Sequence, residues 1–201
     1  MKFIVLPGFT MDKKHKDIEY LMDKLKQTYP KSKSRCLNPP IRKTSLYKNK
    51  PYHSWYDYHT DHRLKEEEIN KLHLHQSRKR IHQLLNSMDK TDDVFLVGYS
   101  QGACMALDSG LTFPKKLGGI ICFKGHVPSE TFKDIRMQQP VWATHGGKDK
   151  TIGHLVAKKS YNKLKKCGCP VKFYSQPKVN HSIRSGINDE LKQLISLFKP
   201  T

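Results

Sequence analysis

The stretch that decides the fold runs from Asp93 to Asp108 and reads DVFLVGYSQGACMALD. Residues 94–97 form an unbroken run of β-branched and other apolar types, which is typical of a strand covered on both faces. Helix-forming residues such as Ala103 and Met105 follow within a few positions. The pattern therefore predicts a buried parallel strand that leads directly into a helix.

The corner between this strand and helix carries Gly98-Tyr99-Ser100-Gln101-Gly102, which fits the pattern G-x-S-x-G. At such a corner the serine is held in a strained backbone conformation, and its hydroxyl points out of the core. Both glycines are needed because a Cβ at either position would collide with the neighbouring strand or helix. The other interpretation is an ordinary turn with a solvent-facing serine. The flanking strand and helix favour a nucleophile.

The rest of the chain alternates short apolar runs with amphipathic stretches. The expected strands are 3–6, 34–37, 94–97, 117–123, 140–144 and 171–174. Apart from the helix after Ser100, the expected helices are 12–29, 65–88, 152–166 and 187–198. This alternation predicts a three-layer α/β/α sandwich around a mostly parallel sheet of about six strands. We expect one domain over residues 1–201 without a large cap.

Two local features refine this expectation. Residues 41–64 show no periodicity, which favours a lid or the wall of a substrate pocket. Glu66 to Glu68 stand at the start of the helix expected from residue 65, where negative charge suits the helix dipole. If the first and third strands are neighbours in the sheet, Phe9 and Ser100 meet at the carboxyl ends of those strands, where such sheets bind ligands.

Charge, cysteine content and the lengths of the apolar runs limit the classes of protein to which this chain can belong. The 201 residues carry a formal net charge of +19, which attracts anions such as nucleic acid and anionic lipid without selecting one. Five cysteines without a framework spacing predict neither a disulfide nor a metal site. The first apolar run is short, and no stretch has the length of a membrane span. The sequence therefore predicts a soluble, cytoplasmic protein.

A serine hydroxyl becomes a good nucleophile only when a base accepts its proton and a third group orients that base. Asp149 follows the expected strand 140–144, and His181 follows the strand 171–174, so both fall in loops at the edge that carries Ser100. The chain order of Ser100, Asp149 and His181 is the order of nucleophile, acid and base in this architecture. Asp134 and Glu130 are the rival acids, since the acid sometimes follows the preceding strand.

An oxyanion needs backbone amides beside the nucleophile. The amide of Gln101 at the helix start and that of Phe9 after the first strand are the expected donors. Thr10 and Trp55 are candidates for the substrate pocket, although Trp55 could equally anchor its loop to the core. Among the eleven histidines, His145 is expected to stabilise its turn. The clustered histidines between 53 and 82 do not predict a metal site.

The motifs GYSQGA at 98–103, HGGKD at 145–149 and NHS at 180–182 resemble those of the α/β-hydrolase superfamily. The resemblance is strongest to its small carboxylesterases, lysophospholipases and acyl-protein thioesterases, and it includes SWYD at 54–57. It implies hydrolysis of carboxylic esters or thioesters, often of acyl chains, without a metal. The chain departs from the family in two places: Pro7 replaces the histidine of the oxyanion loop, and KGHVP at 124–128 replaces a small serine-containing turn before a tryptophan.

We therefore expect a serine esterase or thioesterase that forms an acyl-enzyme on Ser100, needs no cofactor and acts on a small-molecule acyl substrate. One alternative is a non-catalytic binding module that uses its basic surface for nucleic acid or anionic lipid; no specific nucleic acid is predicted, and the association with anionic surfaces would be weak. The other is a peptidase or amidase that uses the same three side chains.

Overall fold

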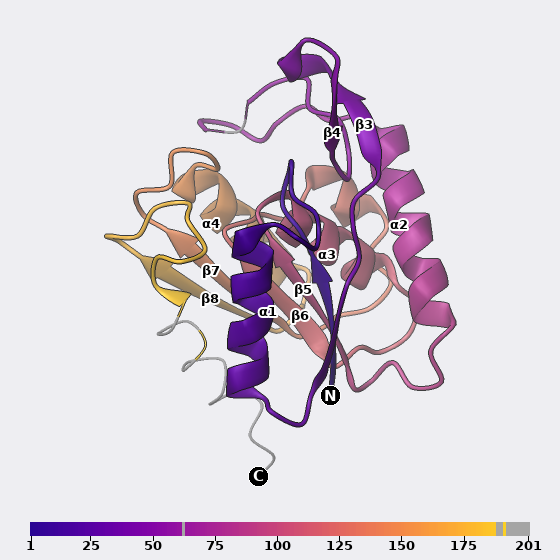
Figure 1. The fold of residues 1–201 in the computed structure, drawn as a ribbon. Helices are drawn as coiled ribbons and strands as arrows, with labels where there is room; N and C mark the ends of the chain where they lie inside the picture. Colours follow the sequence, from indigo (N-terminus) through magenta and orange to yellow (C-terminus); the bar gives the residue numbers. More distant parts are fainter. Residues whose placement is uncertain (62, 188–190, 192–201) are drawn as a thin grey trace.

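We describe the protein from a computed structural model, in which residues 1–61, 63–187 and 191 are placed well enough to be described. A six-stranded sheet forms the middle layer (Figure 1). Its strands are β1 (Lys2–Leu6), β2 (Lys33–Cys36), β5 (Val94–Tyr99), β6 (Gly119–Phe123), β7 (Val141–Gly146) and β8 (Val171–Gln176). The order is β2-β1-β5-β6-β7-β8, and each neighbouring pair is parallel. The predicted fold class and all six predicted strands are confirmed.

Helices cover both faces of this sheet because its strands are apolar on both sides (Figure 1). The helices are α1 (Lys16–Thr28), α2 (Lys71–Asn86), α3 (Gln101–Thr112) and α4 (His154–Lys166), with a short 3₁₀ segment, η2 (Ser129–Lys133). Phe3 and Val5 of β1 pack toward α1, whereas Ile4 and Leu6 belong to the core shared with α2, α3 and α4. The alternating directions of strand side chains thus produce two cores, one on each face.

Residues 41–64 are more ordered than the absence of periodicity predicted. A hairpin of β3 (Ile41–Thr44) and β4 (Lys50–His53) stands here, joined by the 3₁₀ segment η1 (Ser45–Tyr47). It projects away from the central sheet (Figure 1). The strands were missed because they are short and rich in Lys and Arg, and because Pro51 argues against a strand although an edge position tolerates it.

Helix α2 begins at Lys71, not at residue 65 as predicted. Asn70 caps it by accepting a hydrogen bond from the His73 amide at 3.1 Å, and Ile69 forms a bridge with Tyr58 instead of a helical turn. The three acidic residues 66–68 therefore precede the helix, and its first turn holds no acidic residue. The predicted last helix, 187–198, falls almost entirely outside the described residues.

The first and third predicted strands, β1 and β5, are neighbours, with Leu6 opposite Gly98. The turn after β1 therefore lies against the corner after β5. A Cβ placed on Gly8 would stand 3.3 Å from the Ser100 Cβ. The condition under which the sequence placed this turn beside Ser100 is thus met, and the parallel strands bring the residues after β1, β5, β7 and β8 to one edge of the sheet.

Candidate active site

Ser100 stands between β5 and α3 with φ of 55° and ψ of −124°, a conformation that L residues rarely adopt. The flanking glycines allow it. A Cβ on Gly98 would overlap the backbone of α3, and one on Gly102 would overlap the carbonyl oxygens at the end of β1. The Ser100 amide donates to Phe123 O of β6 at 2.9 Å. The corner is thus fixed by close packing on three sides, as predicted for both glycines.

The side chains of Asp149 and His181 reach this corner from the loops after β7 and β8. His181 Nε2 lies 2.9 Å from Ser100 Oγ, and His181 Nδ1 lies 2.7 Å from Asp149 Oδ2. The two loops are packed tightly, since a Cβ on Gly146 would overlap the backbone at Val179. The structure therefore brings together all three residues that the sequence singled out.

The Asp149 carboxylate is oriented through both oxygens. Its Oδ1 accepts the amides of Thr151 at 2.8 Å and Ile152 at 2.9 Å, while Oδ2 faces His181. Burial alone would raise the pKa of Asp149, but the hydrogen bond and charge of His181 and the hydrogen bond from the Ile152 amide outweigh it and lower that pKa below its usual range. The group is thus an anion at neutral pH.

Three other titratable side chains were candidates for roles near this edge. Burial lowers the pKa of His145 to about 4, so the ring is neutral, and its Nε2 lies 2.9 Å from Ile152 O within its own turn and 3.3 Å from Asp149 Oδ2. Asp134 accepts a hydrogen bond from Arg78 at 2.7 Å. Glu130 pairs with Lys133 at 2.9 Å and with Lys71. Neither rival acid is the partner of His181.

The turn after β1 lies beside the corner and is held by a buried indole. Trp55 is fully buried, and its Nε1 donates to Pro7 O at 2.8 Å. Of the two interpretations of Trp55, the structure favours the anchor over the pocket wall. Thr10 has its amide bonded to His53 O at 2.8 Å and an exposed side chain at a φ of 67°.

The side chain of Gln101 ties the same loop to the start of α3. It is fully buried; its Oε1 accepts the Trp55 amide at 2.9 Å, and its Nε2 donates to Tyr56 O at 2.8 Å. Ser54 also exchanges hydrogen bonds with it. The residue after the serine is therefore positioned by the SWYD segment, a role that the motif alone did not reveal.

The sequence missed a buried pair beside the site. His126, after β6, lies with Nε2 2.8 Å from Glu67 Oε2, and both side chains are at most 2% exposed. Burial alone would lower the pKa of His126, but Cys104 and the Glu67 carboxylate outweigh it and hold that pKa well above its usual range. Lys124 is also fully buried and donates to Gln176 Oε1 at 3.2 Å. Lys124 and His126 both belong to the KGHVP segment at 124–128, which departs from the family pattern.

A cavity of about 360 Å³ opens between the segment 64–66 and α4. Its apolar lining includes Val127 and Phe132 after β6 and Leu155 of α4. Its described lining residues include His126 and none of Ser100, Asp149 and His181, so the cavity is distinct from the corner that holds these three side chains.

Among residues 1–61, 63–187 and 191, no group of three or more His, Cys, Asp or Glu side chains is arranged to hold a metal ion. No helix within that part of the chain combines the length and the apolar character required to cross a membrane.

Residues 15–198 match the model of the family described as phospholipase/carboxylesterase. The chain belongs to this family. The resemblance of the motifs at 98–103, 145–149 and 180–182 to small carboxylesterases and acyl-protein thioesterases is thereby confirmed at the level of the family.

Curated relatives and solved structures agree with this assignment. The chain is 31% identical over 113 residues to a probable carboxylesterase SOBER1-like protein of Arabidopsis thaliana, which covers 54% of the chain and 42% of the relative. It is 26% identical over 134 residues to acyl-protein thioesterase 1 of Saccharomyces cerevisiae, covering 63% of the chain and 57% of the relative. The matches thus span about half the length of these relatives.

The fold is shared over nearly the whole chain. The crystal structure of Arabidopsis thaliana SOBER1 superposes with a TM-score of 0.81 at 22% identity, covering 98% of this chain and 96% of that one. Zea mays acyl-protein thioesterase 2 superposes with a TM-score of 0.76 at 20% identity, covering 97% and 92%. At these identities the comparison establishes the fold.

Proposed function

We propose that this protein is a serine hydrolase that cleaves carboxylic esters or thioesters through an acyl-enzyme on Ser100. The observation that carries the proposal is the continuous chain from Ser100 Oγ to His181 Nε2 at 2.9 Å and from His181 Nδ1 to Asp149 Oδ2 at 2.7 Å. The names of the curated relatives, carboxylesterase and acyl-protein thioesterase, support the same class of reaction.

The protonation states follow from the surroundings. Because Asp149 is an anion, it accepts the Nδ1 proton of His181, and Nε2 is left with the lone pair that faces the serine. Ser100 Oγ attacks the substrate carbonyl carbon as its proton passes to Nε2. That proton then goes to the leaving alcohol or thiol, and the acyl group stays on Ser100. A water molecule then attacks the acyl carbon as its proton passes to His181 Nε2. That proton returns to Ser100 Oγ as the carboxylic acid is released.

The oxyanion of each tetrahedral intermediate requires backbone donors. We assign them to the amides of Gln101, at the start of α3, and of Phe9 in the turn after β1. The next two amides of that turn are used by the fold, since Thr10 donates to His53 O at 2.8 Å and Met11 donates to Gly8 O at 3.2 Å. Phe9 is therefore the natural second donor, and the Trp55 indole on Pro7 O keeps its turn in place.

Turnover of p-nitrophenyl acetate tests the proposal. The wild-type protein should hydrolyse it, and Ser100→Ala should lower kcat by several orders of magnitude, on the order of 10⁴-fold or more. Ser87→Ala, at an exposed serine at the end of α2, is the matched control and should retain full activity. A wild-type protein no faster than Ser100→Ala would refute the proposal. An anilide of the same acyl group, hydrolysed as fast as the ester, would favour an amidase.

A further inference from the structure

The cavity between the segment 64–66 and α4 joins an apolar lining to hydrophobic side chains that stand in solvent. Its volume is about 360 Å³, and Val127 and Phe132 line it on the side of β6 and η2. Leu64 and Leu155 also line it. They are 95% and 66% exposed, so two of the large hydrophobic side chains that the described residues leave in solvent border one hollow. Exposed apolar groups gathered around a cavity are typical of a binding site.

The walls of this cavity are fastened to one another. The Val127 amide donates to Ser160 Oγ of α4 at 3.0 Å, and the Ser129 amide donates to Glu66 Oε1 at 2.5 Å. One wall is the KGHVP segment at 124–128, in which the chain departs from the family pattern. The cavity is therefore a preformed feature of this chain, and it need not share the ligand preference of the relatives.

Two lysines on α4 give the cavity positive charge. Lys159 and Lys163 both line it, about one helical turn apart. Lys163 Nζ lies 4.2 Å from the centre of the Phe132 ring, which places its charge against the apolar lining. Neither lysine has a carboxylate partner among the described residues, whereas Lys65, another lysine of the lining, lies 3.7 Å from Glu68. The charges of the α4 pair are thus available to a ligand.

The other charged groups of the described lining are engaged within the protein. Glu66 is held by the Ser129 amide. His126 has both ring nitrogens occupied, because Nε2 lies 2.8 Å from Glu67 Oε2 and Nδ1 lies 3.3 Å from Val127 O. The pair of His126 and Glu67 is also buried, so an entering ligand meets the α4 lysines instead.

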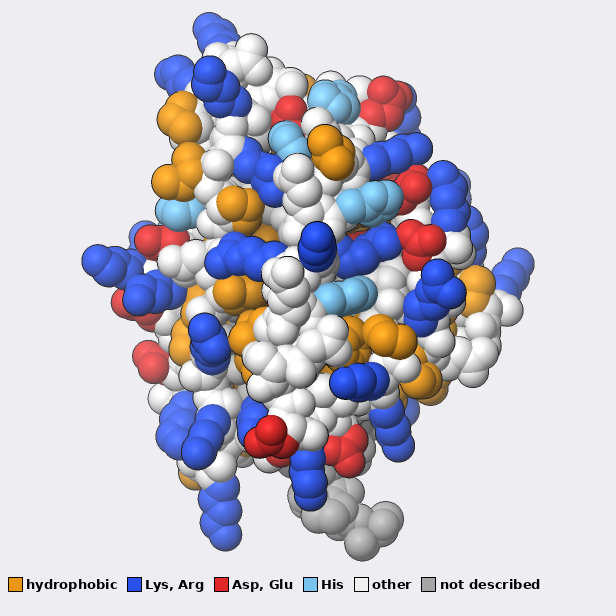
Figure 2. Space-filling model, turned by 90° about the vertical axis from the view of Figure 1, so that its right-hand side faces the viewer, with side chains coloured by type: hydrophobic (Ala, Val, Ile, Leu, Met, Phe, Trp, Pro, Cys, Tyr) orange, Lys and Arg blue, Asp and Glu red, His pale blue; other side chains and the backbone are white. Residues whose placement is uncertain are grey.

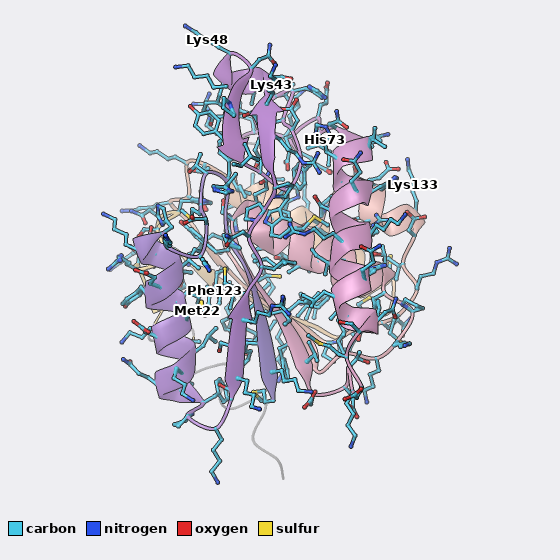
Figure 3. All side chains as sticks on the ribbon, turned by 45° about the vertical axis from the view of Figure 1, so that its right-hand side comes forward. Met22, Lys43, Lys48, His73, Phe123 and Lys133 are labelled. Carbon is cyan, nitrogen blue, oxygen red and sulfur yellow. The ribbon has the colours of Figure 1, made fainter. Side chains whose placement is uncertain are left out.

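Positive charge alone does not single out the cavity. Figure 2 shows Lys and Arg side chains spread over the face that carries α2, with fewer Asp and Glu side chains among them. Lys133, at the end of η2, lies beside α2 (Figure 3), where Glu130 pairs with it at 2.9 Å and with Lys71 at 3.2 Å. Lys159 and Lys163 differ from these lysines because they combine an unpaired charge with an apolar hollow.

We propose that this cavity binds an aliphatic chain that ends in a carboxylate, and that this chain is the acyl group of the substrate. The hydrocarbon lies on Val127, Phe132 and Leu155, where it leaves water. The carboxylate pairs with Lys159 and Lys163. At about 30 Å³ for each heavy atom, the volume of about 360 Å³ holds about twelve heavy atoms, which suits a dicarboxylic acyl group of about eight carbons. A neutral alkyl chain of the same length forgoes the ion pairs.

The cavity begins close to the nucleophile. A Cβ on Gly125 would stand 3.1 Å from Ser100 O, and the Tyr161 hydroxyl of α4 fixes this segment by donating to Gly125 O at 3.2 Å. Val127, two residues farther along, lines the cavity. An acyl group on Ser100 that follows this segment therefore extends toward the α4 lysines. The statement about the substrate rests on the proposed hydrolase function, whereas binding of the carboxylate does not.

Calorimetry on Ser100→Ala tests the binding without turnover. Monomethyl suberate, which carries one free carboxylate, should bind roughly tenfold more tightly than dimethyl suberate, as expected for two partly exposed ion pairs. Lys159→Gln with Lys163→Gln should remove this difference. Leu155→Ser should weaken the binding of both compounds, because it removes apolar contact area and no charge.

Steady-state kinetics test whether the substrate is the source of the carboxylate. The mono-p-nitrophenyl ester of suberate and p-nitrophenyl octanoate have acyl groups of equal length, and only the first ends in a carboxylate. The ratio of their kcat/KM values should favour the suberate ester, and it should fall roughly tenfold in Lys159→Gln with Lys163→Gln. Lys158→Gln with Lys165→Gln is the matched control. Both of these lysines are exposed on α4 and lie outside the described lining, so this variant should keep the wild-type ratio.

The two proposals fail separately. Equal binding of the two suberates, or equal losses in both double-lysine variants, would overturn the carboxylate site, the second because it traces the preference to the net charge of the chain. A binding preference without a rate preference would leave free carboxylates as the ligand and overturn the statement about the substrate. A protein that binds monomethyl suberate but hydrolyses neither these esters nor p-nitrophenyl acetate would remove the hydrolase alone. A protein that hydrolyses the acetate but does not distinguish the suberates would remove this inference alone.

Discussion

Replacing Asp149 by Asn tests the proposed chemistry more finely than removing the serine. Asp149 Oδ1 accepts two backbone amides, from Thr151 and Ile152. In Asp149→Asn the side-chain oxygen must stay on these two donors, because a side-chain NH₂ there would meet other N-H groups. The new NH₂ then faces His181 Nδ1, where the carboxylate oxygen stood at 2.7 Å. The substitution therefore alters one protonation site without changing the shape of the side chain.

The consequence is the wrong tautomer of the base. An NH₂ group that donates to Nδ1 requires the proton of His181 to sit on Nε2, which then points a donor at Ser100 and cannot accept its proton. The loss of this tautomer and of the stabilising charge in a serine triad lowers kcat by about 10⁴-fold, or about 5 kcal/mol of transition-state stabilisation. KM should change little, since Asp149 is buried and does not reach the substrate.

The assay is steady-state hydrolysis of p-nitrophenyl acetate, with circular dichroism to confirm that the variant is folded. Asp134→Asn, at the rival acid that pairs with Arg78, is the matched control and should change kcat less than about threefold. A folded Asp149→Asn protein within about tenfold of the wild-type kcat would contradict the assigned role of this carboxylate.

Three further substitutions probe what holds the site together. Gln101→Leu leaves the Trp55 amide buried without this partner, while Tyr56 O keeps the hydrogen bond from the Ser54 hydroxyl at 2.7 Å, so the free energy of unfolding in urea should fall by about 1–3 kcal/mol; a change below about 0.5 kcal/mol would contradict this role. Gly102→Ala forces a Cβ into the end of β1 and should cost about 4 kcal/mol or more, or abolish soluble expression; a wild-type melting temperature would contradict the packing argument. The pair of Glu67 and His126 has a pH signature: because the pKa of His126 is raised in the folded state, its stabilisation is complete below the unfolded value of about 6.5 and is lost as pH rises through the folded pKa. The stability difference between the wild type and His126→Gln should therefore shrink as the pH rises above about 6.5, whereas a constant difference would contradict the charged pair.

Much of the fold was predictable because its signals are local. The apolar run before Ser100, the glycines around it and the alternation of strands and helices each depend on residues close in sequence, and the sheet order then follows from short crossovers. The positions of Asp149 and His181 were predictable for the same reason, since each directly follows a strand of the parallel sheet. Their distances to one another could come only from the structure.

The missed features depend on partners that are distant in sequence. Glu67 looked like a residue of a helix N-terminus, and nothing near it indicated that His126 would meet it in the core. Gln101 is an unremarkable polar residue until the backbone of Trp55 and Tyr56 is placed against it. The hairpin was missed because lysine-rich strands of four residues carry little periodicity, although Asn49, at a φ of 57°, is a typical turn residue.

The most direct measurement of the central claim is the site and stoichiometry of labelling by a fluorophosphonate, which reacts with serines that are activated by a neighbouring base. Intact mass and peptide mapping should show one phosphonyl group per chain, located on Ser100, and His181→Ala should abolish the reaction. A natively folded protein that is not labelled, or that is labelled equally well in His181→Ala, would contradict the claim that His181 activates Ser100.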